Sequence, residues 1–117
     1  MTRTLIAAML MLTAVPAEAA SNTSVAGLGE TVRLGALRVT PVSIVEDSRC
    51  PRMVSCVWRG RLRIRALVRG TGQVILDNGV PVRVASGRLT LVDATPLSQH
   101  GEVPTPSAYR FRLRFER

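Results

Sequence analysis

Residues 58–68 read WRGRLRIRALV, and apolar and charged side chains alternate along this segment. Successive residues of a β-strand face opposite sides of its sheet, so this alternation is typical of a strand with one buried face. Trp58 and the aliphatic side chains other than Leu67 occupy the even-numbered positions. The segment therefore predicts a long strand whose outer face carries Arg59, Arg61, Arg63 and Arg65.

The last segment of the chain has the same pattern. Tyr109, Phe111, Leu113 and Phe115 share one predicted face, and we expect their rings to form the centre of the core together with Trp58. The opposite face carries a second row of arginines, which consists of Arg110, Arg112 and Arg114.

Shorter alternating segments fill the rest of the chain. They lie at Thr31–Leu34, Leu37–Val45, Gln73–Asp77 and Arg88–Ala94. Asn78-Gly79 is typical of a two-residue hairpin turn, and Pro81 indicates that the next strand lies at a sheet edge. We predict an all-β fold, a single small antiparallel β-sandwich or barrel of about seven strands, with no internal repeat and no helix longer than a turn.

An export signal is predicted at the amino terminus, which reads MTRTLIAAMLMLTAVPAEAA. A basic residue precedes an apolar run, and a small-x-small site ends at Ala19, as in a secretory signal peptide. The run is shorter than the about 20 apolar residues that span a bilayer. We predict a signal peptide at 1–19, a flexible lead-in at 20–30 and a β domain at 31–117, in a periplasmic or secreted protein whose mature chain has no transmembrane span.

The only two cysteines, Cys50 and Cys56, directly precede the Trp58 segment. Because exported proteins meet an oxidising environment, we expect these cysteines to be bonded to each other. Cys56 has the parity of Trp58, which predicts a sulfur that points into the core beside the indole. Closing so short a loop contributes about 2 kcal/mol in the chain-entropy model, so the bond is interpreted as a local clip that helps to set the strand register.

The chain has a net charge of +8, and all 16 of its basic residues are arginine. The absence of lysine is explained by a GC-rich coding sequence, but the placement of the arginines in two rows is not. Like charges directly opposite each other in a sheet repel, so we expect the two rows to be offset, separated by an intervening strand, or interleaved with acids such as Glu46, Asp77 or Asp93.

The functional interpretation of the rows is an anion-binding face, since guanidinium groups bind phosphate and carboxylate in a bidentate way. The partner is then an anionic envelope surface or an acidic protein. The alternative is a solvated sheet face on a structural envelope protein with no small-molecule ligand. Nucleic acid is disfavoured, because the protein is expected to be exported and its aromatic side chains are expected to be buried.

Residues suited to catalysis are few. His100 is the only histidine, bonded cysteines cannot bind a metal, and no nucleophile motif or glycine-rich phosphate loop is present. We therefore predict no catalytic residue, no metal and no cofactor, and a protein that is not an enzyme. Asp47 and Ser48 are interpreted as caps of backbone N–H groups in a turn.

The disulfide-closed loop carries a second hypothesis. A preorganised loop loses little entropy on binding, so Arg52 and Met53 could enter a protease cleft as the contact residues of an inhibitor. The alternative is a plain turn in which Val54 packs inward and Arg52 is solvated.

The segment Asp47-Ser48-Arg49-Cys50-Pro51, continued by Val54, Cys56, Trp58 and Gly60, resembles a known signature. Small exported bacterial proteins of unknown function share the pattern D-S-R-C-P-x-x-V-x-C-x-W-x-G. The resemblance implies export, the disulfide and a β fold, and it brings no activity or catalytic residue. Arg59 stands where members commonly have alanine, so the first arginine row is not implied by the resemblance.

Overall fold

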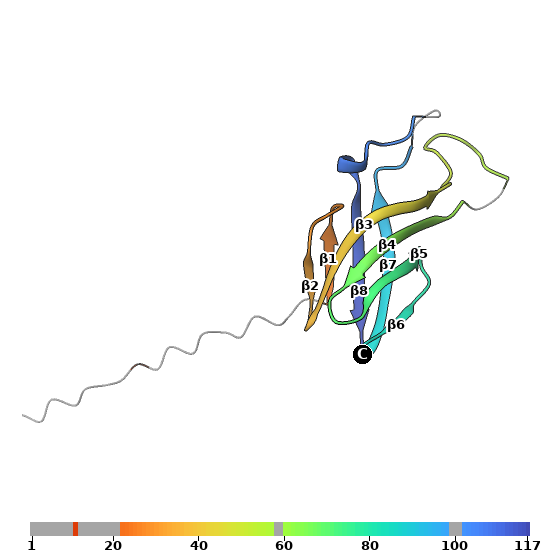
Figure 1. Cartoon of the computed structure of the whole chain (residues 1–117). Coiled ribbons are helices and arrows are strands. Elements are labelled where there is room, and N and C mark those ends of the chain that lie inside the picture. Colours follow the sequence, from red (N-terminus) through yellow and green to blue (C-terminus); the bar gives the residue numbers. More distant parts are fainter. Residues whose placement is uncertain (1–10, 12–21, 58–59, 99–101) are drawn as a thin grey trace, which may run out of the picture.

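The structure, a computed structural model, describes residues 11, 22–57, 60–98 and 102–117. In these ranges the chain forms eight β-strands and one short 3-10 helix (Figure 1). The strands make two antiparallel four-stranded sheets that enclose a core built from both. The predicted all-β antiparallel sandwich is therefore confirmed.

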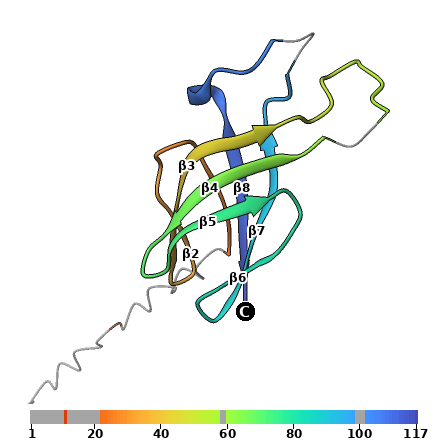
Figure 2. The same cartoon turned by 45° about the vertical axis from the view of Figure 1, so that its right-hand side comes forward.

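We call the two layers the front sheet and the back sheet, and Figure 2 shows them from a second side. The front sheet has the order β2-β3-β4-β5, with bounds Val32–Leu34, Leu37–Asp47, Leu62–Val68 and Gly72–Asp77. The back sheet has the order β1-β8-β7-β6, with bounds Thr23–Ala26, Arg110–Glu116, Gly87–Thr95 and Val82–Val84. The 3-10 helix, Pro106–Ala108, precedes β8.

The predicted alternation holds along β4 and β8, which lie inside their sheets. Their buried side chains belong to one core cluster: Leu62, Ile64, Ala66 and Val68 from β4, and Phe111, Leu113 and Phe115 from β8. Tyr109 is also buried, and its ring stacks on that of Phe111 with the centroids 5.7 Å apart. Trp58 and Arg59 lie outside the described residues, so the predicted place of the indole stays a prediction.

Three expectations about individual segments are wrong. The strand predicted for residues 58–68 is β4, which begins at Leu62, so Gly60 and Arg61 precede the strand rather than belonging to it. Thr23–Ala26 falls in the predicted lead-in but forms β1, because its backbone pairs with β8. Asn78-Gly79 does not close a hairpin, since β5 belongs to the front sheet and β6 to the back sheet. The prediction that the strand after Pro81 lies at an edge is confirmed by β6.

The described strands form an internal repeat, contrary to our expectation. Adding 50 to the residue numbers takes the pairs Val32↔Val39 and Arg33↔Arg38 of β2–β3 onto Val82↔Leu89 and Arg83↔Arg88 of β6–β7. Both long strands, β3 and β7, have a bulge at the equivalent place, between Pro41 and Ser43 and between Leu91 and Asp93.

Turn hydrogen bonds follow the same shift. Gly29 N–H donates to Pro41 O at 2.7 Å, and Gly79 N–H donates to Leu91 O at 2.8 Å. The two glycines have φ values of 79° and 78°, a conformation that favours glycine. These turns carry β1 into β2 and β5 into β6, from one sheet to the other. The sandwich is therefore built from two similar four-strand halves that exchange their first strands.

Candidate functional site

The signature segment forms a polar cluster at one end of the sandwich, which we call the loop end. Arg49 binds the Asp47 carboxylate through Nε at 2.8 Å and Nη2 at 3.0 Å, and Tyr109 donates its hydroxyl to Asp47 Oδ2 at 2.5 Å. Arg49 also donates to the carbonyls of Ala94 (2.7 Å) and Pro96 (3.0 Å), at the end of β7. The cluster thus joins the end of β3 in the front sheet to the back sheet.

The cluster is well shielded, with side-chain exposures of 11% for Arg49 and 12% for Asp47. Burial alone would raise the pKa of Asp47, but the hydrogen bonds from Arg49 and Tyr109 outweigh it and lower that pKa. Burial and the bond to the Asp47 carboxylate raise the pKa of Tyr109 to about 12. Asp47, Arg49 and Tyr109 therefore bind one another, and we interpret the cluster as structural.

Two further signature residues close the base of the loop. Ser48 Oγ accepts the Arg61 N–H at 2.9 Å, and Ser48 N–H donates to Arg61 O at 2.8 Å. At Gly60 a β-carbon would lie 1.7 Å from the Ser48 carbonyl oxygen, so only glycine fits. The prediction of local capping is confirmed for Asp47, which accepts the Arg49 N–H at 3.4 Å. Ser48 also caps a backbone N–H, but that of Arg61, 13 residues away, rather than a local one.

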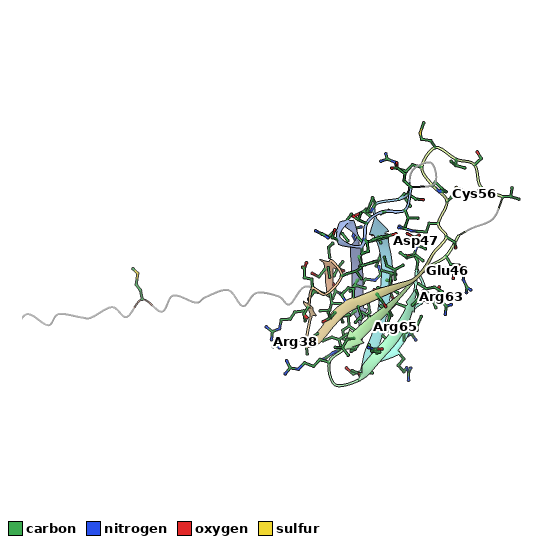
Figure 3. The ribbon with its side chains drawn as sticks, turned by 45° about the horizontal axis from the view of Figure 1, so that its top comes forward. Arg38, Glu46, Asp47, Cys56, Arg63 and Arg65 are labelled. Carbon is green, nitrogen blue, oxygen red and sulfur yellow. A yellow bond between two sulfur atoms is a disulfide. The ribbon has the colours of Figure 1, made fainter. Side chains whose placement is uncertain are left out.

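The predicted disulfide between Cys50 and Cys56 is present. The prediction that the Cys56 sulfur points into the core is wrong, because Cys56 is exposed in a loop that projects from the sandwich (Figure 3). Arg52 and Met53 at its tip are exposed, as the inhibitor hypothesis requires, but Met53 has a φ of 65°. Val54 is 45% exposed, so it does not pack inward.

The two predicted arginine rows do not form one surface. Arg63 and Arg65 lie on the outer side of the front sheet, whereas Arg110, Arg112 and Arg114 lie on the outer side of the back sheet. The core separates these two sides. The structure therefore corrects the seven-arginine face: Arg61, Arg63 and Arg65 belong to one side, the back-sheet row belongs to the other, and Arg59 lies outside the described residues.

Acids pair with four of the six row arginines that the structure describes, whereas Arg65 makes no ion pair with a described residue. Asp77 lies 3.7 Å from Arg61 and 3.6 Å from Arg63, and Asp93 lies 3.4 Å from Arg112. Arg114 pairs with Glu116 at 3.0 Å, whereas Arg110 makes no ion pair with a described residue and donates to the carbonyls of Ser107 and Tyr109.

Six of the nine described arginines that make no ion pair with a described residue lie at the opposite end of the sandwich, which we call the hairpin end; the other three are Arg52, Arg65 and Arg110. This end comprises the β2–β3, β4–β5 and β6–β7 turns and the residues that follow β8. Six exposed arginines at this end make no ion pair with any residue in the described ranges: Arg33, Arg38, Arg69, Arg83, Arg88 and Arg117. The one acid described there, Glu116, is occupied by Arg114. Figure 3 shows Arg38 at this end, far along the sheet from Glu46 and Asp47.

Three hollows open at the hairpin end. The first, about 870 Å³, lies on the outer side of the front sheet and is lined by Arg38, Arg69, Thr31, Thr40 and Leu67 among others. The second, about 410 Å³, is lined by Arg83, Ser86, Arg88 and Arg117 with Glu116. The third joins the β2–β3 turn to Glu116 and Arg117. Arginine side chains thus surround surface hollows large enough for small anionic groups.

Sequence reasoning missed the hairpin-end arginines because it searched for charge within single strands. The signal that could have found them is the pair of motifs V-R-x-x-x-x-R, at Val32–Arg38 and Val82–Arg88. Each motif places two arginines directly opposite each other across a tight hairpin.

His100 lies outside the described residues. Among residues 22–57, 60–98 and 102–117, no three His, Cys, Asp or Glu side chains are grouped as metal ligands. The same part of the chain contains no helix that is long and apolar enough to span a membrane. Comparison with protein families, with curated proteins and with solved structures finds no match to this chain.

Proposed function

We propose that the protein is an exported, non-enzymatic binding module whose hairpin end engages an anionic component of the cell envelope. Its ligand groups are carboxylates, sulfates or phosphates, which guanidinium groups bind in a bidentate way. One observation carries the proposal. Six arginines without acidic partners in the described ranges share one end of the sandwich, while most of the others are neutralised within the fold.

The energetics of the hairpins support this choice of surface. Arg33 lies directly opposite Arg38, and Arg83 lies directly opposite Arg88. Like charges in directly opposed positions destabilise a sheet, so neither pair is there for stability. An anion between two such arginines would relieve their repulsion, and binding accounts for an arrangement that folding does not.

Export is part of the proposal and rests on the predicted signal peptide at 1–19, together with the disulfide. Disulfides persist in oxidising compartments and are rare in the cytosol. The test is the intact mass of protein recovered outside the cytosol. We expect a chain that lacks residues 1–19 and has no free thiol.

The second hypothesis, a protease inhibitor acting through Arg52, receives less support. Chains that add to an enzyme cleft as a strand are extended, whereas Met53 adopts a left-handed conformation with φ of 65°. Arg52 N–H also donates to Ser98 O at 3.0 Å, so this part of the loop backbone is already paired within the protein.

The proposal is tested by retention on heparin resin and on vesicles with an anionic lipid, over a range of salt concentrations. Binding by exposed charges weakens as salt shortens the Debye length, which is about 10 Å at 0.1 M. The test variant replaces Arg33, Arg38 and Arg69 by Gln. The matched control replaces Arg61, Arg63 and Arg112 by Gln, which removes the same charge from arginines that have acidic partners.

We expect the wild type and the control to be retained at low salt, and the hairpin-end variant to elute much earlier. Equal loss in both variants would mean that net charge alone drives retention. Failure of the folded wild type to bind any of the anionic probes would refute the proposal.

A further inference from the structure

We infer that the hairpin end is a bipartite site for a linear anionic polysaccharide, which crosses the end of the sandwich and contacts both hairpins at once. This inference rests on the proposed function and adds the class of ligand and the way in which it binds. It is carried by the internal repeat, by two hollows that share Glu116 and Arg117 between the hairpins, and by the orientation of the two hairpins.

Because of the internal repeat, each of the two edge hairpins carries an equivalent pair of opposed arginines. Arg33 and Arg38 of the front sheet correspond to Arg83 and Arg88 of the back sheet under the shift of 50 residues. Each pair is exposed and belongs to a short edge strand and the start of a long one. One ligand with repeating charge can therefore meet the same arrangement twice.

Two neighbouring hollows, which share the lining residues Glu116 and Arg117, lie between the two hairpins. One hollow joins Gly35 and Ala36 of the front hairpin to Glu116 and Arg117, and the next joins the same two residues to Arg83 and Arg88. Arg117 thus lies between the two hairpins, and a chain that passes from one to the other remains beside cationic side chains.

The orientation of the two arginine pairs favours a flexible polymer as the ligand over a flat surface. Arg33 and Arg38 point outward from the front sheet, and Arg83 and Arg88 point outward from the back sheet, because their strand neighbours are buried in the core. The two layers of a sandwich lie roughly 10 Å apart. A planar bilayer cannot lie against both outer sides at once, whereas a polymer can bend across the end.

The hollow on the outer side of the front sheet contains more than charge, which favours a sugar polymer. Thr31 and Thr40 share a hydrogen bond of 2.6 Å between their hydroxyl oxygens, beside Arg38. Leu67, opposite Thr40 on β4, is 44% exposed and lines the same hollow. Hydroxyl groups, an apolar side chain and guanidinium groups together match the hydroxyls, C–H face and acidic group of a charged sugar.

The experiment measures the affinity of heparin-derived oligosaccharides of graded length, from the disaccharide upward, for four folded proteins at one low salt concentration. These are the wild type, Arg33→Gln/Arg38→Gln, Arg83→Gln/Arg88→Gln, and the Arg61→Gln/Arg63→Gln control. We expect wild-type affinity to rise steeply at the length that bridges the hairpins, by about 100-fold or more, because the second contact becomes intramolecular. Each hairpin variant should lose this rise and retain weak binding, and the control should keep the rise.

The outcomes separate the inference from the proposed function. Binding that depends on the hairpin-end arginines but increases only gradually with length would overturn the bipartite site and leave the proposed function standing. Binding to phosphatidylglycerol vesicles without binding to any oligosaccharide would assign the end to a lipid surface and would also overturn the inference. No binding to oligosaccharides or vesicles would overturn both.

Discussion

Asp47 and Arg49 are the residues on which the loop end depends, because the ion pair between them is shielded and links the two sheets. A shielded pair is not by itself strong evidence for stability, since desolvation offsets much of the attraction between the charges. Loss of one partner is costly, because it leaves a buried charge without compensation. The signature residues before Cys50 are therefore explained by structure, which is why the proposed function lies elsewhere.

Tyr109 gives a direct readout of this cluster, because it is the only tyrosine of the chain. Its pKa is raised to about 12 by burial and by the Asp47 carboxylate, from an ordinary value of 10.0. A raised folded-state pKa contributes stability that is complete below the unfolded pKa and is lost as pH rises towards the folded pKa. We expect tyrosinate absorbance to appear near pH 12, with stability falling above pH 10. If Tyr109 titrated in the folded protein with its ordinary pKa, the described hydrogen bond between Tyr109 and Asp47 would be contradicted.

Gly60 tests how closely the base of the loop is packed. A β-carbon there would lie 1.7 Å from Ser48 O, so Gly60→Ala must displace backbone. We expect a loss of unfolding free energy of about 3 kcal/mol or more in urea denaturation.

The matched control is Gly29→Ala, where φ is 79° but no atom lies within 4 Å. This variant should lose only the about 1–2 kcal/mol of left-handed strain. A loss at Gly60 no greater than at Gly29 would contradict the close approach.

Sequence reasoning reached part of this residue-scale description. It identified Asp47 as a local cap because the Arg49 N–H lies two residues along the chain, but it could not show that Ser48 caps the N–H of Arg61, 13 residues away. It did not identify Tyr109 as a partner of Asp47, since 62 residues separate them and only the packing of β3 against β8 brings them together. The prediction that Cys56 points into the core was wrong because β4 begins only at Leu62. Residues before a strand need not alternate between its two faces.

At the scale of elements, the two edge hairpins are the unusual feature. Alternation predicted their strands but not which strands would pair, and an arginine that looks isolated in sequence can lie opposite another one. The wrong prediction at Asn78-Gly79 has the same origin. The local turn forms, with Val80 N–H donating to Asp77 O at 3.0 Å, but the chain leaves it for the other sheet.

The hairpins give a prediction about stability. Arg33→Glu replaces a repulsive pair with an attractive one opposite Arg38, so we expect unfolding free energy to rise by roughly 0.5 kcal/mol at low salt. The gain should shrink at high salt because the charges are exposed. Arg61→Glu, which places a like charge beside Asp77, should instead lower stability. Urea denaturation at two salt concentrations measures both, and no gain in Arg33→Glu would contradict the cross-strand repulsion.

For the whole molecule, the exchange of first strands between the halves has a consequence for folding. Within the described pairings, β1 pairs only with β8, and β5 pairs only with β4. Each half therefore lacks one strand of its sheet when it stands alone. Fragments 20–70 and 71–117 should each be unfolded by circular dichroism and should recover β signal when mixed. A cooperative unfolding transition in either isolated fragment would contradict this interdependence.

The repeat also explains the charge asymmetry of the molecule. Each half delivers its arginine hairpin to the same end, whereas the acids that neutralise arginines lie mainly along the strands and towards the loop end. The net charge of +8 follows from the composition, and the two arginine rows were predicted from the alternation of residues along two segments. Neither could show which arginines an acid would neutralise. That depends on strand register, which brings Asp77 to Arg63 and Asp93 to Arg112.

The most direct measurement of the central claim is NMR of the arginine side-chain Nε–Hε groups during titration with a heparin-derived oligosaccharide at low salt. The account predicts shifts at Arg33, Arg38, Arg69, Arg83, Arg88 and Arg117, with little change at the acid-paired Arg61, Arg63 and Arg112. Shifts concentrated at the acid-paired arginines, or spread evenly over both groups, would contradict it.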